Sequence, residues 1–176
     1  MGQKMVEAMA LRLAEAIKRI EPDRTASIAV MKFSIEVLMN TLITLFFISI
    51  VGFLTGAFGK TMLGLGAFVL LRFFSGGLHL SKAIHCSFLS VILISIAPHI
   101  PLSNTGILII GGANLILILA FAPSNIEGHA RIPNKYFPLL KLVSALIVSI
   151  NFVFLSSTIV MVQLFQAIST INFKRR

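Results

Sequence analysis

One short stretch of the chain gathers the residue types that could perform covalent chemistry. It holds Arg72, Gly76 and Gly77, then His79 and, seven residues later, Cys86, the only cysteine. A cysteine acts as a nucleophile only as its thiolate, and a neighbouring imidazole can accept the thiol proton or stay as a cation beside the sulfur. The pattern therefore predicts a catalytic cysteine, Cys86, with His79 as its base.

The residues that precede His79 indicate how such a site would be supported. Arg72 carries a permanent positive charge that could favour a thiolate or hold a substrate carboxylate. Backbone N–H groups around Gly76 and Gly77 could stabilise an oxyanion, because glycine allows close approach. Singly, these residues have plainer explanations: a lone cysteine is usually a small buried group, and paired glycines usually serve helix packing or breaking. Their co-location is what favours catalysis.

The spacing of His79 and Cys86 also constrains the backbone between them. On a continuous helix, seven residues separate two Cα atoms by about 10.5 Å, although both side chains share a face. Direct contact between imidazole and sulfur requires about 3 Å. We therefore predict that residues 79–86 are not one straight helix. His85 is a rival base, but a sequence neighbour points about 100° away on a helix.

A third catalytic group is not evident in the sequence. Asn134, Glu127 and Glu36 are candidates, and a His–Cys dyad is the alternative. Glu36, Asn134 and Lys135 are also candidates for contact with a substrate. We expect neither a metal ion nor a cofactor, and the sequence contains no ATP-binding motif.

The composition places this stretch in a membrane protein. Of the 176 residues, 57% are hydrophobic and 12% are charged, whereas soluble domains average about 45–50% and about 25%. A soluble protein of this length could not bury so much apolar surface. The sequence predicts an all-α integral membrane protein, a polytopic helical bundle of about five to six membrane segments that forms one domain over 1–176.

The apolar runs give the expected membrane segments. A spanning helix needs roughly 20 apolar residues. The uncharged run 142–173 would make about 48 Å of helix against a hydrocarbon core of about 30 Å. It is either a tilted, protruding helix or two helices broken near Asn151 or near 156–158. The expected spans are about 37–58, 61–78, 87–101, 106–122 and 139–171, the last as one helix or as two.

Residues 3–21 predict an amphipathic helix before the first span. Such a helix could lie at the membrane interface, in the headgroup region, or pack on the cytoplasmic face of the protein itself. Lys32 and Glu36 follow, one helical turn apart, and are expected to pair. The apolar face of the helix recurs at spacings of three and four, with charges opposite, and comprises Val6, Met9, Leu13, Ala16, Ile17 and Ile20.

The net charge of +9 is better explained by membrane orientation than by nucleic-acid binding. Basic residues lie in the gaps between apolar runs, and such residues gather in cytoplasmic loops. We predict a multi-pass protein of the cytoplasmic membrane with a cytoplasmic N-terminus. The loops 72–86 and 123–141 then also fall inside, so the active site lies near the cytoplasmic face. The terminal run 174–176, Lys-Arg-Arg, favours an even number of crossings.

At these residues the sequence resembles a known family. The pattern R-x3-G-G-x-H-x6-C, formed by Arg72, Gly76, Gly77, His79 and Cys86, resembles the signature of the accessory gene regulator B (AgrB) family. The resemblance extends to the size, the amphipathic start, the run of spans and the later proline- and lysine-containing loop.

The resemblance implies a function in peptide signalling. Family members are cysteine endopeptidases in the cytoplasmic membrane of Gram-positive bacteria, and they cut the C-terminal part from a small AgrD-like propeptide. The family's catalytic pair corresponds to His79 and Cys86. A cysteine or serine of the peptide then attacks the acyl-enzyme, which gives a thiolactone or a lactone for an autoinducing quorum-sensing peptide.

The expected partners are the AgrD-like propeptide and the lipid bilayer, and a homodimer is left open. The alternative function is a small polytopic membrane transporter or peptide-export component without catalysis, in which Arg72 and Glu36 are pathway residues. A non-catalytic assembly subunit is a further alternative. Loss of the thiol separates these readings, because only the peptidase requires it.

Overall fold

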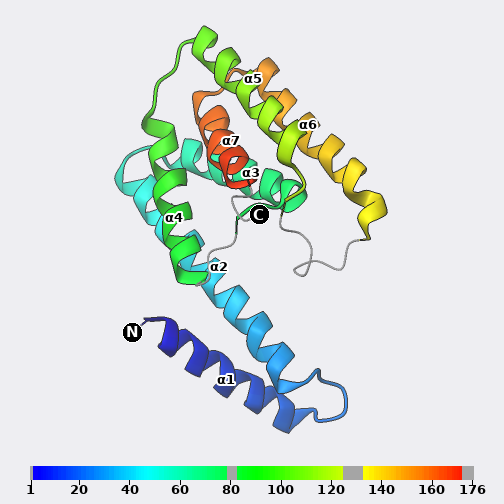
Figure 1. Cartoon of the computed structure of the whole chain (residues 1–176). Helices are drawn as coiled ribbons and strands as arrows, with labels where there is room; N and C mark the ends of the chain where they lie inside the picture. The colour runs from blue at the N-terminus through cyan, green and yellow to red at the C-terminus, as the bar shows by residue number, and fades with distance from the viewer. Residues whose placement is uncertain (1, 79–82, 125–132, 172–176) are drawn as a thin grey trace.

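The computed structural model describes residues 2–78, 83–124 and 133–171, and every regular element in those ranges is a helix (Figure 1). The predicted α-helical class is therefore confirmed for the described residues. The α-helices are α1 (Gly2–Ile20), α2 (Ile28–Leu54), α3 (Phe58–Ser75), α4 (Ala83–Ile96), α5 (Asn104–Phe121), α6 (Phe137–Phe154) and α7 (Ser157–Ser169), with short 3-10 helices η1 (Ala97–His99) and η2 (Asn134–Tyr136).

Four of these segments are long and apolar enough to cross a membrane: α2, α3, α5 and the stretch Asn134–Phe154. The helices α4 and α7 are apolar but have only 14 and 13 residues. Thirteen residues rise about 20 Å, which is less than the hydrocarbon thickness of about 30 Å. The described residues thus fit a multi-pass membrane protein, and the count of five to six segments stays a prediction.

The long uncharged run near the C-terminus forms two helices, α6 and α7. Leu155 adopts a left-handed conformation with φ 48° and ends α6. The Asn151 side chain accepts from the Ser156 N–H at 3.0 Å and donates to the Ser156 carbonyl at 3.2 Å. The Ser156 hydroxyl in turn accepts from the Ile159 N–H and caps α7. Local polar chemistry therefore fixes the junction.

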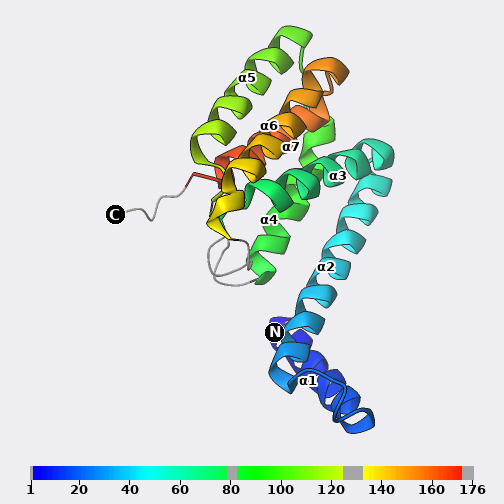
Figure 2. The same ribbon diagram turned by 90° about the vertical axis from the view of Figure 1, so that its right-hand side faces the viewer.

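The N-terminal part of the chain projects from the rest of the bundle (Figure 2). There α1 packs on α2 and buries three small or branched side chains, Val6, Ala10 and Ala14. Four of its larger apolar side chains remain exposed: Met9, Leu13, Ile17 and Ile20. Their exposure fits contact with lipid, and the position of α1 at the membrane interface stays a prediction. The expected pair at the start of α2 is confirmed, with Lys32 Nζ 3.4 Å from Glu36 Oε1.

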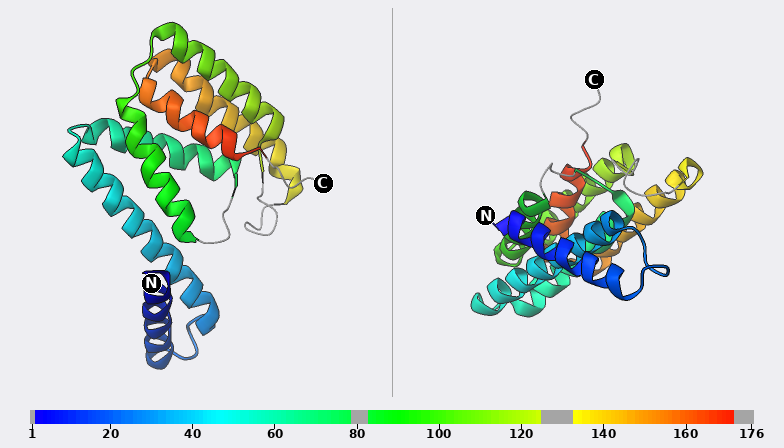
Figure 3. Two further views of the ribbon diagram at one scale, coloured as in Figure 1. Left: turned by 60° about the vertical axis from the view of Figure 1, so that its left-hand side comes forward. Right: turned by 90° about the horizontal axis from the view of Figure 1, so that it is seen from below.

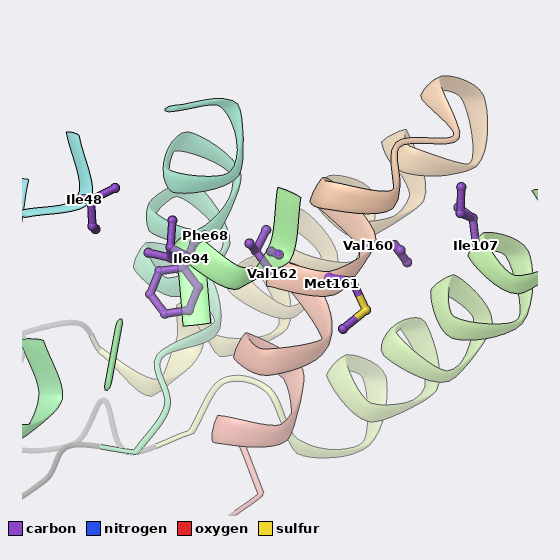
Figure 4. Close-up of a cluster of buried hydrophobic side chains, with 8 residues drawn as sticks. Ile48, Phe68, Ile94, Ile107, Val160, Met161 and Val162 are labelled. Atoms are coloured by element: carbon purple, nitrogen blue, oxygen red, sulfur yellow. The ribbon is translucent and has the colours of Figure 1, made fainter. Parts of the chain in front are cut away.

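The bundle is built around α7, which contacts α3, α4, α5 and α6 and lies alongside α5 and α6 in Figure 3. Gly64 allows α3 to approach α7, because a Cβ there would lie 3.1 Å from Thr158 Cγ2. Small residues at such contacts are typical of helix packing in membranes. The main buried cluster is shown in Figure 4 and comprises Ile48, Phe68, Ile94, Ala97, Ile107, Val160, Met161 and Val162.

Candidate active site

The ends of α3, α5 and α7 meet in a turn formed by Gly76 and Gly77. Both glycines have positive φ, 66° and 132°, a region that other residues rarely adopt. The Gly77 N–H donates to the Ser124 carbonyl at 2.9 Å, and the Ser124 N–H donates to the Ser75 carbonyl at 3.0 Å. A Cβ on Gly77 would lie 2.5 Å from Ser169 Oγ. The turn therefore requires glycine at this position for both conformation and space.

Arg72, one turn before the end of α3, directs its guanidinium to several acceptors. Its Nη2 donates to the Leu78 carbonyl at 3.0 Å and to the Cys86 sulfur at 3.8 Å. Its Nη1 donates to Gln166 Oε1 at 3.3 Å. The guanidinium carbon also lies 6.0 Å from the centroid of the Phe68 ring. Arg72 thus links the turn, α4 and α7.

Gln166 completes this network from α7. Its side chain is fully buried. Besides accepting from Arg72, it donates through Nε2 to the Gly76 carbonyl at 2.6 Å and to Ser75 Oγ at 2.9 Å. Burying an amide is costly unless it is hydrogen-bonded, and here both the oxygen and the nitrogen of the amide have partners.

Cys86 lies in the first turn of α4 (Ala83–Ile96) and is half-buried, with a free thiol. Its side chain lines an open cavity of about 310 Å³ with mostly apolar walls. Among the described residues, the charged group that contacts this sulfur is the Arg72 guanidinium. The other lining residues are Phe68, Leu78, Leu89, Ser90, Leu93, Phe165, Ile168, Ser169 and Ile171.

The comparisons with known proteins match nearly the whole chain. The family model for accessory gene regulator B (AgrB) matches residues 7–172, nearly the whole chain. The chain belongs to the AgrB family. A protein from Halalkalibacterium halodurans described as AgrB-like is 29% identical over 153 residues, which cover 86% of this chain and 77% of that protein. No solved structure matches the chain. Membership links the chain to the processing of quorum-sensing peptides.

Of the residues in the AgrB-type motif, the structure brings Arg72 and Cys86 into contact. His79 lies outside the described residues, as do Glu127 and residues 79–82 of the predicted break. The proposed pairing of His79 with Cys86 therefore stays a prediction. The rival base His85 is exposed and is not among the residues that line the cavity at Cys86.

The two glycines of the motif are engaged differently from the expectation. The Gly76 N–H donates to the Arg72 carbonyl at 3.0 Å, and the Gly77 N–H donates to Ser124. In this structure both donors serve the turn, so an oxyanion would have to replace one of these bonds. Their part in oxyanion stabilisation stays a prediction, and their part in shaping the turn is an observation.

The other predicted residues lie apart from the cavity in the described structure. Glu36 is paired with Lys32 on α2. Asn134 and Lys135 form η2 and are exposed, and the Lys135 ammonium lies 5.1 Å from the centroid of the Tyr136 ring. Their role in substrate contact stays a prediction. In the described ranges, no three His, Cys, Asp or Glu side chains gather as a metal site.

Sequence reasoning missed Gln166 and the two serines whose carbonyls hold the turn, Ser124 and Ser169. A signal existed for the glutamine. Gln163 and Gln166 stand one helical turn apart in a mostly apolar run without charges, and polar side chains in such runs usually face the interior of the protein. The serines contribute main-chain atoms, which residue types do not reveal.

Proposed function

We propose that the chain is a membrane-embedded cysteine endopeptidase that cleaves the C-terminal part of an AgrD-like propeptide through an acyl-enzyme on Cys86. The proposal rests on one observation above the others. The Cys86 sulfur lies 3.8 Å from a guanidinium nitrogen of Arg72 and faces an apolar cavity. The guanidinium is a permanent cation, and the thiolate of a cysteine is the nucleophile of thiol catalysis.

Cleavage then follows the ordinary course of thiol catalysis. The Cys86 thiolate attacks the carbonyl carbon of the scissile amide, the C–N bond breaks, and the departing amine takes a proton. His79, the family's catalytic histidine, is the proposed source of that proton. Products of this step are a peptide thioester on Cys86 and a free C-terminal fragment.

Release of the acyl group completes the reaction. A cysteine of the bound peptide attacks the thioester carbonyl, its thiol proton passes to His79, and the bond from the carbonyl carbon to the Cys86 sulfur breaks, which regenerates the Cys86 thiolate as a cyclic thiolactone forms. One thioester replaces another, so this step needs no ATP. A serine in place of that cysteine gives a lactone.

The surroundings of Cys86 support ring closure over hydrolysis. Forming a thioester from an amide is uphill, so water must be kept from the acyl-enzyme. The cavity is lined by apolar side chains from α3, α4 and α7, among them Phe68, Leu93 and Phe165. An apolar segment of the propeptide can occupy these walls, while an amphipathic part of it lies on the bilayer surface.

The proposal includes an orientation in the cytoplasmic membrane, with the N-terminus and the active site at the cytoplasmic face. Residues 76–78 and Ser124 are hydrogen-bonded to each other or to α7, so the ends of the two basic loops lie at the same end of the bundle. Basic residues near that end favour the cytoplasmic side.

Co-expression with candidate propeptides tests the proposal. Cys86→Ala and Cys86→Ser should abolish cleavage, because no other cysteine exists in the chain, and should leave membrane insertion intact. His79→Ala should also abolish cleavage, whereas His99→Ala, an exposed histidine of η1, should leave it near wild type. Mass spectrometry of the wild type should detect a covalent peptide adduct on Cys86.

Normal processing by Cys86→Ala would contradict the peptidase directly. Reconstitution in liposomes addresses the transporter alternative, which requires peptide flux that persists in the same variant.

A further inference from the structure

Gln166 lies on α7, outside the sequence motif, yet its side chain is hydrogen-bonded to Arg72 and to the turn at Gly76. Its Oε1 accepts from Arg72 Nη1, and its Nε2 donates to the Gly76 carbonyl and to Ser75 Oγ. These partners lie 90 to 94 residues away along the chain, at the C-terminal end of α3. All hydrogen bonds of the Gln166 side chain among the described residues therefore point at the site.

A second glutamine on the same helix provides a contrast. Gln163 is equally inaccessible, with 1% of its surface exposed against 0% for Gln166. It donates to the Ile147 carbonyl on α6 at 3.1 Å, and its Oε1 has no hydrogen-bond partner among the described residues. Two glutamines in one environment thus have different partners, and only Gln166 contacts Arg72.

We propose that Gln166 is a positioning residue for the chemistry of Cys86: its amide oxygen holds one nitrogen of the Arg72 guanidinium so that the other nitrogen stays on the sulfur. This inference rests on the proposed function of Cys86 as nucleophile. It assigns the orienting role to α7, outside the motif that carries the chemistry.

Arginine needs such a partner because its side chain is long and has many rotamers, which are lost only where hydrogen bonds fix the planar head. In this site Nη2 is shared between the Leu78 carbonyl and Cys86, and the contact to sulfur is the longer, at 3.8 Å against 3.0 Å. Release of Nη1 frees the head to rotate, and the sulfur contact is the first to be lost.

A neutral amide suits this task better than a carboxylate. A glutamate at this position would accept from Arg72, but it would form an ion pair and offset the positive charge felt by the sulfur. It would also lack the Nε2 donor that the Gly76 carbonyl and Ser75 Oγ use. The orienting residue therefore fixes Arg72 without neutralising it.

Alkylation of Cys86 by iodoacetamide tests the inference in the purified full-length protein in lipid nanodiscs. Cys86 is the only cysteine, so the rate reports this thiol alone. The rate is measured at pH 7, where only a small part of an ordinary thiol is ionised, and at pH 10, where most of it is. The ratio of the two rates cancels changes in access to the cavity.

Gln166→Met removes the amide and keeps the length of the side chain. We expect the pH 7 rate to fall about tenfold, the size of effect that loss of a hydrogen bond to a charged group gives, with the pH 10 rate within about twofold of wild type. Gln166→Glu should lower the pH 7 rate similarly. Gln163→Met, the matched control on the same helix, should keep the wild-type ratio although it removes an equally buried amide.

Arg72→Met supplies the reference, since Gln166 is argued to act through Arg72. Adding Gln166→Met to Arg72→Met should change the ratio no further, because the two act as one unit. A wild-type ratio in Gln166→Met would overturn the inference, as would an equal fall in Gln163→Met. The alkylation assay uses no propeptide, so its outcome is independent of the processing assay. Normal processing by Cys86→Ala would reject the peptidase, whereas a wild-type alkylation ratio in Gln166→Met would reject the role of Gln166.

Discussion

The helices α2 and α7 are both apolar, yet they have opposite surroundings. α2 has 27 residues, of which only Ile48 and Gly52 are buried, and many of its large apolar side chains are exposed. α7 has 13 residues, and more than half are buried: Thr158, Val160, Met161, Val162, Gln163, Gln166 and Ala167. Lipid is the proper solvent for the first helix, whereas protein surrounds the second.

Their polar side chains show the same difference. On α2, Ser34, Thr41 and Thr44 donate to carbonyls four residues earlier in their own helix, the usual way for hydroxyls to be satisfied without a neighbour. On α7, Gln163 and Gln166 bond to other helices. Because apolar residues can face either lipid or protein in a membrane, the partners of polar side chains show which face is inside, and they place both glutamines of α7 in the interior of the bundle.

The largest effect should come from breaking the contact of α7 with the turn. Gly77→Ala places a Cβ 2.5 Å from Ser169 Oγ at a residue with φ 132°. Strain of about 1–3 kcal/mol at such a backbone position should reduce propeptide processing about fivefold or more, measured by mass spectrometry after co-expression. The control Gly66→Ala on the same helix α3 meets open space and should process normally. Wild-type processing by Gly77→Ala would show that the contact of α7 with the turn is not needed for processing.

A smaller effect should separate the two helices by stability. Met161→Ala on α7 empties a site that is 9% exposed and should cost about 2 kcal/mol or more. Leu42→Ala on α2, at 56% exposure, should cost less than about 0.5 kcal/mol, as surface changes do. Thermal unfolding in one lipid composition measures both. Equal losses of unfolding free energy in the two variants would mean that protein covers α2 as it covers α7.

The smallest effect concerns the ion pair at the start of α2. Lys32→Met breaks a partly exposed contact of 3.4 Å with Glu36, so we expect a loss of no more than about 0.5 kcal/mol. A double-mutant cycle with Glu36→Gln measures the coupling within the pair. Coupling well above about 1 kcal/mol would place the pair in a far less polar environment than the bilayer surface.

The sequence predicted best what neighbouring residues decide. The helical class follows from composition, and the Lys32–Glu36 pair follows from a spacing of four. Asn151 and Ser156 were candidates for a break and form the junction between α6 and α7. The start of α2 at Ile28, before the apolar run, shows the limit of hydropathy, because charged residues that pair can extend a helix beyond its apolar part.

The support of Cys86 could not be predicted in this way. Arg72 and Gln166 are 94 residues apart, and only the packing of α3 on α7 brings them together. Gln163 and Gln166 are the same residue type in the same run, so sequence alone does not say which one faces the site. The carbonyls of Ser124 and Ser169 hold the turn, and every residue type has a carbonyl.

The main-chain bonds around Gly77 have a consequence for sequence divergence. The three bonds that join residues 75, 77 and 78 to Ser124 and Ser169 use only N–H and carbonyl groups. Substitutions at the two serines can therefore accumulate without breaking these three hydrogen bonds, provided that the new side chains do not clash with Gly77. Distant homologues can retain the shape of the pocket after most of their side chains have drifted, provided that the glycines and the path of α7 persist.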